Sequence, residues 1–139
     1  RKQSIHAQNQ SIRRRFLFEV IGLIAYGSFA ETDRLIDGYE LPADGSERDY
    51  VVIATQGRGD SAALKAAVQM PSRYLAFVGS RKKAAALKAD LKAAGIPAAA
   101  LEAIRAPAGL DIGAITPDEI AFSIVAEMIE IRRRGQRTL

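Results

Sequence analysis

Apolar residues along this chain occur in short blocks that alternate with longer segments of helical period. The blocks at residues 16–25, 50–55 and 74–78 are rich in aliphatic side chains and are bounded by turn-forming residues, which predicts buried strands. Strands that alternate with helices are typical of a parallel sheet covered by helices. We therefore expect an α/β fold with a parallel sheet covered by helices.

Each of the two later strands is followed by a predicted helix. Asp60 is expected to cap the first helix and Pro71 to end it, while Ser80 caps the second and Gly95 ends it. The inward face of the first is predicted to hold Ala63, Leu64, Ala67 and Val68. That of the second is predicted to hold Ala84, Leu87, Leu91 and Ala94.

The C-terminal helix has the clearest signals in the chain. Thr116 and Glu119 have the spacing of a capping box, and Pro117 takes the first helical position. Its buried face is predicted to hold Ile120, Ile124, Met128 and Ile131, with Val125 beside them. Before it, Pro97 opens a short helix that contains Leu101 and Ile104. Residues 26–49 are rich in turn formers and predict at most a short helix at 31–36 and a brief strand at 39–41.

The length of 139 residues and the apolar fraction of 48% predict one globular domain. We expect residues 16–139 to form it, with residues 1–15 as a basic tail or remnant helix. No apolar run reaches the roughly 18 to 20 residues that span a bilayer. No secretory signal is visible either, so the expected location is cytoplasmic.

Composition also limits the chemistry. The chain has no cysteine and one histidine, which excludes thiolate metal sites and a persulfide-carrying role, and no metal site is predicted. The net charge of +4 lies largely in the two ends, where no nucleic-acid recognition motif is present, so we expect solvated termini. The motifs of nucleophilic hydrolases, P-loop enzymes and dinucleotide-binding folds are missing, so no catalytic residue is assigned.

Three segments that follow or join predicted strands are candidates for binding, because ligands of open α/β sheets bind at the carboxyl ends of strands. In the first segment, two glycines allow close backbone approach and polar side chains could meet an anion. A plain turn with an Asp cap is the alternative. The first segment comprises Thr55, Gln56, Gly57, Arg58, Gly59 and Asp60.

The second segment places three cations at the start of a helix, where they oppose the macrodipole by roughly 0.3 to 1 kcal/mol each. A phosphate held by backbone N–H groups and Ser80 would compensate. A basic face in water is the alternative. This segment comprises Gly79, Ser80, Arg81, Lys82 and Lys83.

The third segment contains Gly109, Asp111 and Gly113. The two glycines suggest special backbone angles around an acid that could take part in binding. Asp111 could instead hydrogen-bond its own loop, which is a common use of Asp in turns.

In this order, the runs "YVVIATQGRGD", "YLAFVGSRKKAAAL" and "APAGLDIGAITPDEIAFSIVAEMIEIRRRG" resemble the C-terminal Rossmann-type domain of the XdhC/CoxI family. These proteins are accessory factors of xanthine dehydrogenase and related molybdenum hydroxylases. The "ATQGRGD" variant is most similar to the CoxF-type branch, associated with carbon monoxide dehydrogenase.

The resemblance implies a non-catalytic factor that binds molybdenum cofactor, as molybdopterin or its dinucleotide, aids its modification and passes it to a hydroxylase apo-enzyme. The phosphate of that cofactor would meet the Arg81 to Lys83 cluster. Since the chain has no cysteine, sulfur would come from a partner such as a sulfurtransferase. An NAD(P)-dependent oxidoreductase is less favoured, because the Gly-rich turn and the ribose-binding acid are missing. A scaffold that binds only the client enzyme is a third possibility.

The resemblance implies a three-layer Rossmann-like parallel sheet with helices on both faces, in which we expect the family's first strand and Gly-rich turn to be missing. The sheet would then begin with residues 16–25 at an edge. An apolar edge strand tends to pair with another chain, which predicts a homo-oligomer.

Overall fold

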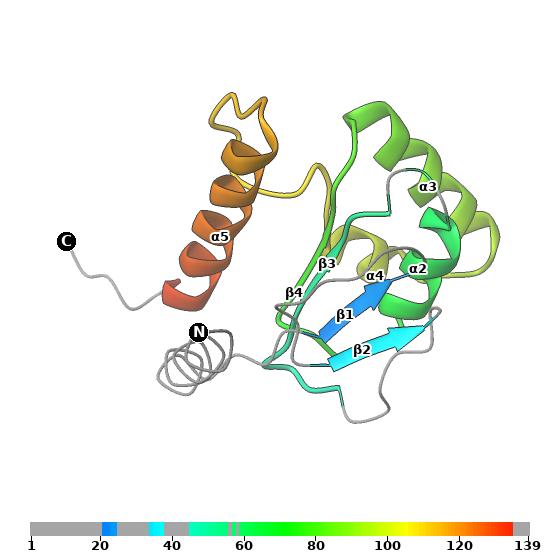
Figure 1. Ribbon diagram of the computed structural model, residues 1–139. Coiled ribbons are helices and arrows are strands. Elements are labelled where there is room, and N and C mark those ends of the chain that lie inside the picture. The colour runs from blue at the N-terminus through cyan, green and yellow to red at the C-terminus, as the bar shows by residue number, and fades with distance from the viewer. Residues whose placement is uncertain (1–20, 25–33, 38–44, 56, 58, 135–139) are drawn as a thin grey trace. The chain divides into compact units, whose positions relative to one another are not determined.

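A computed structural model describes residues 21–24, 34–37, 45–55, 57 and 59–134 (Figure 1). The chain divides into two compact units, residues 1–40 and 41–139, and each is treated by itself. The predicted boundary at residue 15 and the predicted strand at 39–41 lie outside the described residues.

In the first unit, two short strands pair in parallel. β1 (Ile21–Ile24) lies within the predicted strand at residues 16–25, and it is paired with β2 (Arg34–Asp37). The helix expected at residues 31–36 is therefore wrong over residues 34–36. Pairing with a neighbouring strand outweighs a local helix preference, which is a weak determinant over so few residues.

The second unit contains a parallel sheet in the order β3-β4-β5, formed by β3 (Tyr50–Ile53), β4 (Tyr74–Phe77) and β5 (Ile104–Arg105). All four residues of β4 are buried, whereas Val52 of β3 is 39% exposed. The middle strand of the described sheet is therefore β4. The short β5 was not predicted, because two residues are too few to give a periodic signal.

Helices cover both faces of this sheet (Figure 1). One face carries α2 (Asp60–Ala67), α3 (Arg81–Ala93) and α4 (Ala98–Ala103), and the other carries α5 (Pro117–Arg133). Successive side chains of β4 point to opposite faces of the sheet. Tyr74 and Ala76 lie on the same face and pack against Ile124 of α5. The expected α/β Rossmann-like architecture is confirmed.

Most of the predicted helix ends are confirmed. The Ser80 hydroxyl accepts the backbone N–H of Lys83 at 3.2 Å, and Gly95 follows α3 with a φ of +90°. At α5, Thr116 and Glu119 form the complete capping box. The N–H groups of Ile115 and Thr116 both donate to the Glu119 carboxylate and hold its pKa below the usual range.

Several detailed predictions are wrong. Gly59, with a φ of +76°, precedes α2 and Asp60 makes no cap, because its carboxylate pairs elsewhere. Ile104 belongs to β5 and not to the short helix. Ala94 is exposed beyond the end of α3, and Val125 is 52% exposed because Ser123 and Glu127 face the sheet instead. None of the helices in the described residues is long and apolar enough to cross a membrane.

Candidate functional site

Two of the three candidate segments meet at the carboxyl ends of β3 and β4. Because these strands are parallel, the loops that follow them start from one edge of the sheet. Asp60 begins α2 and Lys83 lies in the first turn of α3, and their side chains form an ion pair with Nζ 2.5 Å from Oδ2. The Lys83 ammonium also lies 5.8 Å from the centre of the Phe77 ring. Lys83 therefore points into the protein and joins the two loops.

Asp60 has one oxygen paired with Lys83 and one without a partner among the described residues. Its side chain is only 7% exposed, and Oδ1 is buried with no hydrogen bond from the described part of the chain. The buried Oγ1 of Thr55, in the same loop, has no partner there either. Buried polar atoms are normally paired, so each of these exceptions calls for a partner such as a water molecule, an ion or a ligand.

The glycines of these two loops have different surroundings. Gly57 has a φ of +90°, and a Cβ added there would lie 3.4 Å from the Lys83 Nζ, so this backbone runs close to the ion pair. A Cβ on Gly79 would meet the ring of Phe77. The predicted site residues Gln56 and Arg58 lie outside the described residues.

The third segment reaches the second through an exposed ion pair. Arg81 Nη2 lies 3.0 Å from Asp111 Oδ2, and the two side chains are 77% and 83% exposed. Asp111 thus pairs with the first turn of α3. The alternative in which it hydrogen-bonds its own loop did not include this contact. Lys82 is exposed and makes no ion pair with any residue in the described ranges. Two of the three cations at the start of α3 therefore form ion pairs with carboxylates of other segments, Asp60 and Asp111.

Gly109 and Gly113 have separate roles. Gly113 has a φ of +75° and open space around it. Gly109, with a φ of +93°, packs so closely on α5 that an added Cβ would overlap Ser123 Oγ. Its N–H donates to Glu127 at 2.9 Å, so Gly109 fixes the loop to α5. It does not belong to the group of Thr55, Asp60 and Lys83, which we call the Asp60 cluster.

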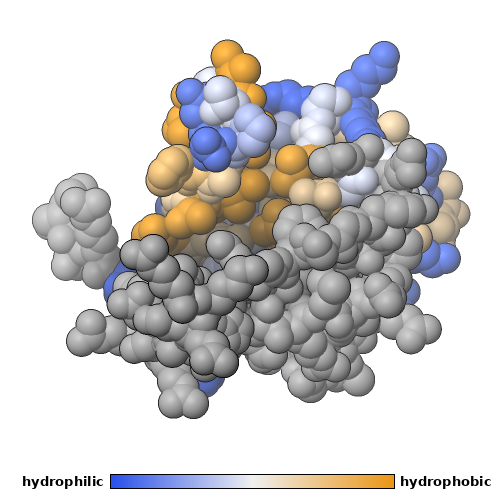
Figure 2. All heavy atoms as spheres, viewed as in Figure 1, coloured by the Kyte–Doolittle hydropathy of each residue, from blue (hydrophilic) through white to orange (hydrophobic). Residues whose placement is uncertain are grey.

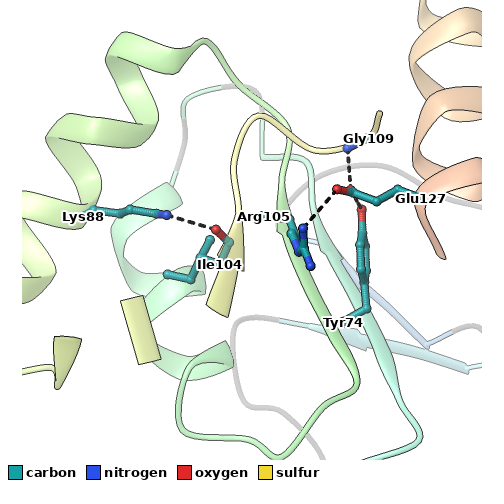
Figure 3. Close-up of polar contacts among 6 residues, drawn as sticks. All are labelled: Tyr74, Lys88, Ile104, Arg105, Gly109 and Glu127. Atoms are coloured by element: carbon teal, nitrogen blue, oxygen red, sulfur yellow. Dashed lines mark hydrogen bonds and ion pairs between the residues drawn. The ribbon is translucent and has the colours of Figure 1, made fainter. Parts of the chain in front are cut away.

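Glu127 is the centre of a buried network that the sequence did not predict (Figure 3). Its Oε2 accepts the Tyr74 hydroxyl at 2.6 Å as well as the Gly109 N–H. Its Oε1 lies 3.8 Å from Nη1 of Arg105. Burial and the bond to Glu127 raise the pKa of Tyr74 well above its usual range, so the phenol stays protonated.

The position of Glu127 carried a signal. It lies three residues after Ile124 and seven after Ile120, on the apolar face of the C-terminal helix. An ionisable residue in such a position requires a buried partner. Its partners come from β4 and from the loop after β5, and only the fold brings these segments to α5. Nearby, Lys88 of α3 donates to the Ile104 carbonyl at 3.0 Å and fastens α3 to β5 (Figure 3).

The described residues of the site offer groups that can bind a ligand. Within the residues that the structure describes, no group of three His, Cys, Asp or Glu side chains could hold a metal ion. The Asp60 cluster offers hydrogen-bond acceptors and cations at the edge where the loops meet. Both carboxylate oxygens of Glu127 already contact Tyr74, Gly109 or Arg105, so Glu127 is a structural group.

Known proteins resemble this chain over most of its length. A solved structure described as a xanthine dehydrogenase from Bacillus halodurans is 30% identical with a TM-score of 0.59, covering 77% of this chain and 31% of that one. The uncharacterised protein YqeB of Escherichia coli K12 is 33% identical over 87 residues, which are 63% of this chain and 16% of YqeB. The chain thus spans less than a third of the length of either relative.

The family comparison covers both the described sheet and the preceding unit. The model of the XdhC Rossmann domain matches residues 5–128, which includes all three candidate segments. That match extends the resemblance seen in the sequence toward the N-terminus. The chain belongs to the family of XdhC Rossmann domains.

Proposed function

We propose that this chain is the Rossmann-type part of an accessory factor for a molybdenum hydroxylase of the xanthine dehydrogenase or carbon monoxide dehydrogenase type, and that it binds molybdenum cofactor. The XdhC family is one of accessory proteins rather than enzymes. The observation that carries the binding proposal is Asp60, a buried carboxylate at the place where two glycine-containing loops meet, with one oxygen that has no partner among the described residues.

The residues of the site fit the chemistry of a molybdopterin. The pterin ring presents N–H donors, and Oδ1 of Asp60 is an acceptor that has no donor within the described residues. The phosphate needs cations, and Lys82 is exposed at the N-terminal end of α3. When bound, the cofactor supplies the molybdenum centre that the client enzyme uses.

The two ion pairs would respond differently to an anion. The Arg81–Asp111 pair is exposed on both sides, so breaking it costs no more than about 1 kcal/mol and frees Arg81 for a phosphate. Lys83 is held by the buried Asp60 and would remain there to orient the carboxylate. The proposed anion contacts are therefore Lys82 and Arg81, and Lys83 acts as a positioning residue.

A scaffold that binds only the client enzyme is the competing function. It is favoured by the internal ion pairs, because Arg81 and Lys83 already have partners without a ligand. The CoxF-type assignment and a sulfurtransferase partner rest on the resemblance and on the absence of cysteine. NAD(P) binding has no comparable support.

Isothermal titration with molybdopterin and with its dinucleotide tests the proposal. We expect binding by the wild-type chain, about tenfold weaker binding by Asp60→Asn and by Lys82→Glu, and wild-type affinity in Lys92→Glu, which makes the same charge change at the other end of α3. Mass spectrometry of ligand retained on the purified protein provides a second measurement. Binding to an apo-hydroxylase without any affinity for molybdopterin would establish the scaffold and contradict our proposal.

A further inference from the structure

The outer side of α5 carries a second apolar surface, opposite the side that packs on the sheet. Phe122, Val125 and Ile129 are 73%, 52% and 46% exposed, and their spacing of three and four residues places them on one side of the helix. We call these three residues the α5 stripe. Hydrophobic residues gather on the surface over α5 in Figure 2. A helix at a protein surface normally has polar side chains there, so an apolar stripe of this kind indicates a partner.

The charges of α5 indicate what kind of partner fits. The first turn holds Asp118 and Glu119, and the last turn holds Arg132 and Arg133. Two copies of α5 placed antiparallel would bring each acidic end beside a basic end and would oppose their macrodipoles. The helix is therefore complementary in charge to itself.

The spacing of these residues fits a two-fold axis. With the axis at the peptide bond between Val125 and Ala126, Phe122 lies opposite Ile129 of the second copy. The same axis places Asp118 opposite Arg133 of the second copy. A single two-fold axis therefore brings both the apolar and the charged residues opposite their counterparts, as an isologous dimer requires.

We propose that the α5 stripe is the interface with a second copy of this chain, formed as an antiparallel pair of α5 helices. The surface differs from the edge strand from which the sequence predicts self-association. A helix of 17 residues is only about 25 Å long, so the contact is small and a dissociation constant in the micromolar range is expected.

Sedimentation velocity of the full chain, from about 1 µM to about 100 µM, is the first test. We expect a concentration-dependent dimer, and a monomer throughout for Phe122→Glu and Ile129→Glu. Ala89→Glu, on the exposed side of α3, is the control and should dimerise as the wild type does. Circular dichroism verifies that each variant is folded. A wild-type chain that stays monomeric, or a dimer that Phe122→Glu leaves intact, overturns the proposal.

Cysteine cross-linking tests the geometry, because the chain has no cysteine of its own. Val125→Cys lies beside the proposed axis and should form a disulfide-linked dimer on mild oxidation. Glu130→Cys is exposed on another side of the same helix and should stay monomeric. Equal cross-linking of both variants would contradict the antiparallel pair.

Exchanging the charges of Asp118 and Arg133 tests whether the partner on the α5 stripe is a second copy of the chain. Asp118→Arg should weaken the dimer, and the double variant Asp118→Arg with Arg133→Asp should restore it, because the two positions face each other only across the axis. Failure of the double variant to recover would overturn the pairing. If the chain is monomeric and hydrogen exchange shows the α5 stripe protected, the occupant is the N-terminal unit and not a second copy.

Discussion

Two carboxylates on opposite sides of the same sheet are almost equally buried, and their surroundings differ. Glu127 on α5 is 6% exposed and Asp60 on α2 is 5% exposed. Glu127 accepts hydrogen bonds from Tyr74 and Gly109 and lies beside Arg105. Asp60 pairs with Lys83 through one oxygen, and the other has no partner in the described residues.

On our proposal, this difference separates a structural role for Glu127 from a binding role for Asp60. A buried carboxylate with all its partners supplied by the protein holds together the segments that supply them. A buried carboxylate with a vacant oxygen, at the edge where ligands of α/β folds bind, can accept a donor from outside. Burial alone would not have distinguished the two residues.

The largest expected effect is that of Glu127→Ala. It leaves the Tyr74 hydroxyl and the Gly109 N–H without their acceptor inside the protein, and we expect the free energy of unfolding to fall by about 3 to 5 kcal/mol. Urea denaturation measures this. Glu130→Ala, exposed on the same helix, should change it by less than about 0.5 kcal/mol. Similar losses in the two variants would show that the network contributes little.

Gly109→Ala tests the same network from the loop. The backbone there has a φ of +93° and the new methyl group would overlap Ser123 on α5, so we expect a loss of about 2 to 4 kcal/mol. Gly113→Ala has the same kind of backbone strain but open space, and should cost about 1 kcal/mol. Thermal unfolding of both compares them. Equal costs would mean that Gly109 is required for its backbone angle and not for its close contact with α5.

Tyr74→Phe should reduce stability by about 1 to 2 kcal/mol at neutral pH, because Glu127 loses one donor. The pKa of Tyr74 is raised on folding, so its contribution is complete below the unfolded value near 10 and is lost as pH rises above that value. The wild-type melting temperature should therefore fall more steeply than that of Tyr74→Phe at alkaline pH. Parallel curves would contradict this role of the phenol.

Asp60→Asn should have the smallest effect on stability, within about 1 kcal/mol, because Lys83 is 40% exposed and can be hydrated. Its effect on cofactor binding should nevertheless exceed that of Glu127→Gln. Urea denaturation and titration of the same preparations measure both quantities. A large loss of stability with unchanged binding would place Asp60 with Glu127 as a structural residue.

Local signals predicted much of the fold. The strands at β3 and β4, the Ser80 cap and the Thr116 capping box all depend on residues close together in the chain, and each is confirmed. Predictions failed where contacts between distant segments decide which side chains are buried. Val125 was expected inside because it is apolar, but the core side of α5 includes Ser123 and Glu127, whose contacts lie on other segments.

The same distinction holds for the site. The sequence by itself determined which loops follow the parallel strands and that they contain glycines and charges, because these properties belong to neighbouring residues. Only the tertiary structure decided the pairs, Lys83 with Asp60, Arg81 with Asp111 and Tyr74 with Glu127. The last two residues are 53 positions apart, and such a pair leaves no periodic pattern. The physical reason is that a charge is recognisable in a sequence, while the partner that neutralises it is chosen by the fold.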